Sequence, residues 1–180
     1  MSKLNDTIVA RMYHSEAILL PDGRVLVSGS DPQTVFPNKT LKFPEEFRVE
    51  VYHPPYLTDG TTQPTFTIAD TDWEHGQTYN ITVNLFQGST ANARVSLLAA
   101  TSSTHGNLMG ARIIFPKVTC TGNSCAIEAP PNVNISPPGW YQLFVLDGPT
   151  PSRSQWVRIG GDPAELGNWP TGAPFTPPGI

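Results

Sequence analysis

The sequence has few charged residues, few cysteines and no long apolar run. Charged side chains make up 14% of the 180 residues, and the formal net charge is −4. This balance argues against nucleic acid as a partner, because binding to phosphates needs a basic face. No apolar run reaches the roughly twenty residues of a membrane-spanning helix, so no membrane span is predicted.

Long helices are not expected either, because nineteen prolines and fifteen glycines interrupt the chain. The apolar runs that remain are short, and several alternate with polar residues, as β-strands do. After residue 60 there are roughly seven such runs in about one hundred residues, the pattern of an immunoglobulin-like β-sandwich. The sequence therefore predicts an all-β protein.

The first part of the chain predicts a smaller unit. It contains a strand-turn-strand pattern, "HSEAILLPDGRVLVSGS", and an alternating run, "FRVEVY". A sheet of about three strands buries little surface alone, but it resembles one blade of a propeller. We place a partial propeller blade at residues 1–60, the β-sandwich at 61–162 and an extended Pro/Gly-rich tail at 163–180.

The two cysteines, Cys120 and Cys125, stand close together in "CTGNSC". The spacer is typical of a turn closed by a disulfide. The alternative, half of a zinc site, lacks a second Cys or His pair at zinc spacing. A disulfide indicates an oxidising compartment.

Four Asn-x-Ser/Thr triplets agree with secretion. They begin at Asn5, Asn38, Asn80 and Asn134. The first residues nevertheless have no apolar core of a signal peptide, so we expect the chain to be the C-terminal part of a longer secreted protein.

Three of the four histidines are separate candidates for site residues. His53 is followed by two prolines at the end of an alternating run, which favours a structural boundary for the Tyr52-His53 pair. His75 lies in a polar turn, where we expect it to face solvent. His105 lies in a connection of small residues that contains two glycines, the kind of loop that often carries site residues.

Tyr13 and the fourth histidine, His14, are adjacent. Adjacent residues of a regular strand point to opposite faces. Both can therefore reach one centre only where the strand bends, bulges or ends. On spacing alone, plain structure is the better interpretation, although two imidazoles and a phenolate form a chemically suitable set for Cu(II).

Four motifs in a fixed order make the interpretation specific. They are "RMYHSEAILLPDGRVLVSGSDP", "VEVYHPPYL", "SSTHGNLMGAR" and "LGNWP". Together they resemble the fungal copper radical oxidases, glyoxal oxidase more closely than galactose oxidase, over nearly the whole chain. The resemblance implies a kelch-type propeller followed by an immunoglobulin-like "early set" domain, with this chain holding the last propeller strands and that whole domain.

The resemblance also implies roles. Tyr13 would be an axial copper ligand and the base that takes the substrate's hydroxyl proton, and His14 and His105 would be equatorial copper ligands. The implied activity is that of a secreted oxidase, which oxidises small aldehydes or alcohols with O2 and gives H2O2. Its radical cofactor is a tyrosine cross-linked to a cysteine, a role that neither Cys120 nor Cys125 matches. We therefore expect the isolated chain, without the remaining propeller blades, to be inactive.

Two other functions stay open. One is a non-catalytic β-sandwich module that binds carbohydrate or packs against a partner domain. Its aromatic candidates are Trp73, Trp140, Trp156 and Trp169, although tryptophans at such places more often serve packing. The other is that a separate chain supplies the missing blades.

Overall fold

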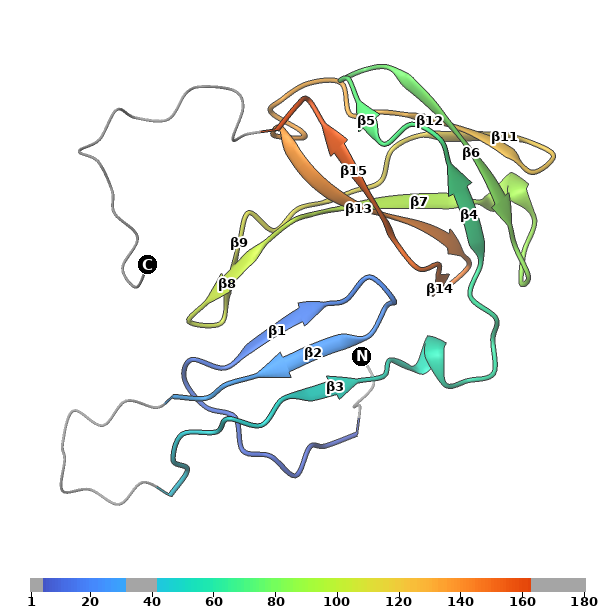
Figure 1. Ribbon diagram of the computed structural model, residues 1–180. Helices are drawn as coiled ribbons and strands as arrows, with labels where there is room; N and C mark the ends of the chain where they lie inside the picture. Colours follow the sequence, from blue (N-terminus) through green and yellow to red (C-terminus); the bar gives the residue numbers. More distant parts are fainter. Residues whose placement is uncertain (1–4, 32–41, 163–180) are drawn as a thin grey trace, which may run out of the picture.

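The computed structural model describes residues 5–31 and 42–162, and these residues fold into β-sheets (Figure 1). No helix in these two ranges is long and apolar enough to cross a membrane. The predicted all-β fold is confirmed. The domain boundaries at residues 60 and 162 remain predictions, and the predicted tail, 163–180, lies outside the described residues.

A three-stranded antiparallel sheet comes first in the chain. Its strands β1 (Glu16–Leu19), β2 (Val25–Ser28) and β3 (Glu50–Tyr52) lie in the order β1-β2-β3. The turn between β1 and β2 contains Gly23 at a φ of +88°, a conformation that glycine adopts without a steric penalty.

The alternating run at residues 47–52 predicts a longer strand than the structure forms. The strand begins only at Glu50, and the side chains of Phe47 and Val49 are 89% and 60% exposed. The Arg11 guanidinium donates to the backbone carbonyls of Gly29 and Arg48. Backbone pairing resumes at Ser30 and Glu46, each of which donates to the other's carbonyl, so the two carbonyls bound by Arg11 lie where the β2–β3 ladder is interrupted.

Two further sheets face each other and form a sandwich. The first has the order β11-β12-β6-β4, and the second has the order β10-β7-β13-β15-β5, with β14 paired to β13. The strands of the sandwich are β4 (Thr65–Ile68), β5 (Asp72–Trp73), β6 (Thr78–Asn84), β7 (Arg94–Ala99), β10 (Ile113–Ile114), β11 (Val118–Thr121), β12 (Ser124–Glu128), β13 (Gly139–Asp147), β14 (Thr150–Pro151) and β15 (Gln155–Ile159).

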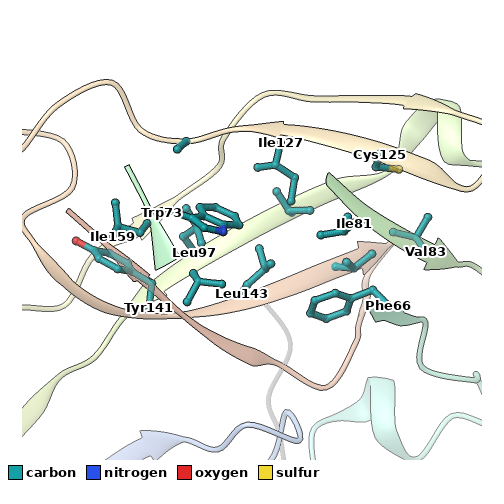
Figure 2. Close-up of a cluster of buried hydrophobic side chains, with 14 residues drawn as sticks. Phe66, Trp73, Ile81, Val83, Leu97, Cys125, Ile127, Tyr141, Leu143 and Ile159 are labelled. Carbon is teal, nitrogen blue, oxygen red and sulfur yellow. The ribbon is translucent and has the colours of Figure 1, made fainter. Parts of the chain in front are cut away.

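The core lies between these two sheets (Figure 2). Alternate residues of the central strands point into it, as in Tyr141, Leu143 and Val145 of β13. Trp73 is almost fully buried and stacks on Tyr79 with ring centroids 4.8 Å apart. The alternation seen in the sequence is therefore the alternation between the core and the outer faces.

The sandwich also contacts the first sheet through the β1–β2 turn. The backbone amide of Ser154 donates to the Pro21 carbonyl at 2.7 Å. The side-chain amide of Gln63, just before β4, donates to the Asp22 carbonyl at 3.3 Å and to the Pro151 carbonyl at 3.0 Å. In the connection from β3 to β4, the hydroxyl of Tyr56, in the short 3-10 turn η1 (Pro55–Leu57), donates to the Gly23 carbonyl at 2.6 Å. A second 3-10 turn, η2 (Thr90–Asn92), precedes β7. These contacts hold the first sheet against the sandwich, and the candidate site lies where the two meet.

Candidate metal centre

Tyr13 and His14 lie in a turn immediately before β1, not on the strand itself. His14 has a φ of +65°, and the amide of Ser15 donates to the Met12 carbonyl at 3.2 Å. The turn removes the alternation that would separate neighbouring side chains, and the two rings lie 3.9 Å apart between centroids. The two neighbouring side chains can therefore lie on the same side of the chain, which a regular strand would not allow.

Hydrogen bonds to the end of β2 hold this turn in place. The Met12 amide donates to the buried hydroxyl of Ser30 at 2.8 Å, and the Asp31 amide donates to the Tyr13 carbonyl at 2.9 Å. The nearly buried Arg11 side chain pairs with Glu50 of β3 at 2.7 Å. The turn is thus attached to β2 and β3 by backbone and side-chain contacts together.

Gly29 supports the same turn by having no side chain. A Cβ atom at this position would lie 2.6 Å from the His14 carbonyl oxygen, and Gly29 has a φ of +72°. Gly29→Ala should therefore displace the His14 backbone and lower the free energy of unfolding by more than the roughly 1–2 kcal/mol that left-handed strain alone costs. Urea denaturation of the two proteins measures this change.

Gly60 is the matched control. It also has a positive φ, +86°, but no atom lies within 4 Å of its added Cβ. Gly60→Ala should cost only the left-handed strain, about 1–2 kcal/mol, and should leave the Tyr13–His14 turn unchanged. Equal destabilisation by the two substitutions would contradict the role assigned to Gly29.

His105 is carried by a separate hairpin, formed by β8 (Ser102–Thr104) and β9 (Asn107–Met109). Thr104 pairs with Asn107, so His105 and Gly106 form a two-residue loop. Their φ angles are +57° and +72°, as a type I′ hairpin turn requires at both positions. In Figure 1 the hairpin reaches from the sandwich to the start of β1.

The hairpin brings the third ring to the first two. The centroid of the His105 ring lies 4.5 Å from that of His14 and 5.6 Å from that of Tyr13. Among the described residues, His14 and His105 are the two non-glycine residues with a positive φ. Backbone strain of this kind persists where the surrounding structure imposes it, often at functional sites.

The hydrogen bonds of the two imidazoles suit metal ligation. His14 Nδ1 lies 2.9 Å from the Asp31 carbonyl oxygen, so it carries the proton that it donates and leaves the Nε2 lone pair free. His105 Nδ1 lies 2.7 Å from the Thr104 hydroxyl. Two Nε2 atoms and the Tyr13 phenol, with 56% of the residue exposed, form a nitrogen and oxygen donor set that fits Cu(II).

Sequence reasoning from motifs did not single out Glu16, the first residue of β1. Its carboxylate accepts hydrogen bonds from the Ser103 hydroxyl and from the Gly106 amide. The Ser103 hydrogen bond, the largest cause, lowers the pKa of Glu16 below its ordinary value. The sequence contained one signal for Glu16, because it is a charged residue at the start of an otherwise apolar strand, "EAIL".

The other candidates are not part of this centre. Cys120 and Cys125 form a disulfide across the β11–β12 pair. His75 is half-buried, contrary to the expectation that it faces solvent, because its ring packs on Gly160 and its Nε2 lies 2.8 Å from the Ser136 carbonyl oxygen. In the described residues, no three His, Cys, Asp or Glu side chains are grouped to hold a metal, and the third ring beside the two imidazoles is that of Tyr13.

Comparison with known families gives two matches. Residues 63–159 match the galactose oxidase-like early set domain, and residues 1–56 match the glyoxal oxidase N-terminus. The early set domain is immunoglobulin-like, which confirms the predicted sandwich. The two matches follow one another in the order that the sequence motifs predicted.

Comparison with individual proteins agrees with these family matches. A WSC domain-containing protein of Arthroderma benhamiae is 53% identical over 100% of this chain and 19% of its own length. A putative aldehyde oxidase of Artemisia annua is 38% identical over 87% of this chain and 28% of its own length.

The fold of a fungal alcohol oxidase, solved in complex with copper, superposes with a TM-score of 0.72 at 23% identity, over 86% of this chain and 32% of that one. The chain therefore spans less than a third of each of these proteins. It belongs to the galactose oxidase-like family, with a segment of the glyoxal oxidase type followed by the early set domain.

Proposed function

We propose that this chain contributes Tyr13, His14 and His105 as ligands of one copper ion in a secreted oxidase of small aldehydes or alcohols. The observation that carries the proposal is the meeting of three rings from a turn and a hairpin about ninety residues apart, with both histidines at positive φ. The name of the aldehyde oxidase relative supports the substrate class, and the Cys120–Cys125 disulfide supports secretion.

The residues of this chain have separate tasks in that reaction. His14 and His105 would hold the metal through Nε2, since their Nδ1 atoms have partners in the protein. The exposed Tyr13 phenolate would accept the hydroxyl proton of an alcohol or an aldehyde hydrate. Copper, when bound, would take up one electron. The oxidation of an alcohol to an aldehyde, or of an aldehyde hydrate to a carboxylic acid, removes two electrons and two protons, which O2 receives as H2O2.

The second electron cannot come from a Cys–Tyr cofactor in this chain. Cys120 and Cys125 are joined to each other, so neither has a thiolate for a cross-link to tyrosine. The residues present therefore do not fit the radical cofactor, although they fit the metal.

The copper-loaded 180-residue chain is accordingly expected to give no H2O2 above a copper-free blank when it is supplied with methylglyoxal and O2. A coupled peroxidase assay measures this, with a protein-free copper solution as the control. Peroxide formation in proportion to the amount of folded chain would falsify the assignment of the radical to residues outside it.

Copper binding by the same chain tests the proposed function itself. With one equivalent of Cu(II), electron paramagnetic resonance should show a tetragonal signal with hyperfine structure from two nitrogens. The alternative, a non-catalytic module that packs or binds carbohydrate, predicts no specific Cu(II) signal. A signal that persists unchanged in a His14→Asn variant would also contradict the proposal.

A further inference from the structure

We propose that Glu16 is a positioning residue, whose carboxylate fixes the β8–β9 hairpin on β1 and so sets the separation of the His14 and His105 rings. This inference rests on the proposed copper function for its purpose, although its geometry stands without the metal. Glu16 lies two residues after His14, so it belongs to the same part of the chain as the Tyr13–His14 turn.

The carboxylate contacts the hairpin on both sides of His105. Its Oε2 accepts a hydrogen bond from the Ser103 hydroxyl on β8, and its Oε1 accepts one from the Gly106 amide in the loop, at 3.3 Å. Because the two contacts use both oxygens of one planar carboxylate, they restrict the direction of the loop as well as its distance from β1. Since His105 lies between the two contacts, its ring is placed with them.

The base of the hairpin is attached to the sandwich, where the Ala99 amide donates to the Arg112 carbonyl and the Ala100 amide donates to the Trp140 carbonyl, whereas its strands and tip have few such contacts in the part of the chain that the structure describes. All three residues of β9 are exposed, including Leu108 and Met109, and the strands β8 and β9 pair only with each other. An isolated two-stranded hairpin is marginally stable in water. A polar contact at its tip therefore has a large influence on where His105 lies.

Two substitutions separate this tether from a role of the negative charge. In Glu16→Gln the amide oxygen can still accept from the Gly106 N–H, and the amide nitrogen can donate to the Ser103 hydroxyl, which is both donor and acceptor. In Glu16→Val both contacts are lost, while the β-branched side chain favours the strand. If Glu16 acted through its charge, the two variants would behave alike.

The experiment begins with the metal-free 180-residue chain. Nuclear magnetic resonance measures contacts between the His105 ring and the His14 and Tyr13 rings, and also the hydrogen exchange rate of the Gly106 amide. The native chain and Glu16→Gln should show the ring contacts and a protected amide. Glu16→Val should lose the contacts and exchange the Gly106 amide faster, without loss of the sandwich signals.

Copper then gives the second readout. Cu(II) affinity, measured by calorimetry with the metal alone, should fall by roughly 10–100-fold in Glu16→Val, the range for loss of a residue that orients a ligand, and should stay near native in Glu16→Gln. Glu128→Val is the matched control, because Glu128 pairs with Lys117 in the sandwich, away from the hairpin. Ser103→Ala, which removes one of the two contacts, should fall between the native chain and Glu16→Val.

Ring contacts and amide protection that survive in Glu16→Val would overturn the inference, as would a Glu16→Gln variant as impaired as Glu16→Val. If Glu16→Val does not fold, an unaltered hairpin in Ser103→Ala has the same consequence. A different result separates the two proposals. If the native chain binds no copper but Glu16→Val still loses the ring contacts, the copper function fails and the positioning role stands.

Discussion

Replacing His105 with asparagine should abolish the two-nitrogen copper site and leave the hairpin that carries it folded. His105 occupies the first loop position of a type I′ turn with a φ of +57°. Asparagine is favoured there, and Asn-Gly is a preferred pair for this turn. The substitution thus removes an imidazole without disturbing the backbone, unlike His105→Ala, which also places alanine at a positive φ.

The expected loss of Cu(II) affinity is more than about 100-fold, since even the loss of an outer partner of a ligand costs 10–100-fold. Calorimetry measures the affinity, and electron paramagnetic resonance should show at most one nitrogen in place of two. His53→Asn is the matched control, because His53 belongs to the other Tyr-His pair and is exposed after β3. Native affinity in His105→Asn, or an equal loss in His53→Asn, would contradict the assignment.

Replacing Trp73 with alanine should have the largest effect on stability. Trp73 is 1% exposed, stacks on Tyr79 and donates its indole N–H to the Asp70 carbonyl at 2.9 Å. Removal of a buried indole costs about 3–5 kcal/mol, because apolar contacts are lost and a cavity remains. Urea denaturation of the chain, followed by circular dichroism, measures the change.

Trp73→Phe separates the contribution of the aromatic stack from that of the hydrogen bond and the larger side-chain volume. It keeps an aromatic ring for the stack on Tyr79 but loses the hydrogen bond and some volume, so it should cost less than half as much. Trp156→Ala is a surface comparison, since Trp156 is 42% exposed, and it should cost clearly less than Trp73→Ala. A Trp73→Ala variant within about 1 kcal/mol of native, the size of an ordinary substitution, would show that this end of the sandwich does not contribute to the core.

The sandwich was predictable from the sequence because its signal is local. The run "TYNITVNLF" places Ile81 and Val83 on one face, and both are buried in the core. The run "FRVEVY" has the same alternation, but the structure forms a strand only from Glu50. Alternation records which residues share a face, but it does not record where the ladder is interrupted, here beside two carbonyls that accept from the Arg11 side chain, distant in sequence.

The candidate centre was less predictable, because it depends on backbone conformations and long-range contacts. Tyr13 and His14 are adjacent in the sequence, which on a regular strand would point their side chains to opposite faces. Only the four motifs in their order favoured the two residues as ligands of one metal. The positive φ of His14, which permits the pair, is imposed by contacts with Ser30 and Asp31. The role of Glu16 depends on a hairpin almost ninety residues away, which no local pattern records.

The most direct test of the central claim is anomalous diffraction at the copper absorption edge from crystals of the 180-residue chain soaked in Cu(II). The account predicts one dominant peak within bonding distance of the Nε2 atoms of His14 and His105, on the side of the Tyr13 hydroxyl. A dominant peak at His53 or His75, or no peak at the Tyr13–His14 turn in crystals that contain copper, would contradict it.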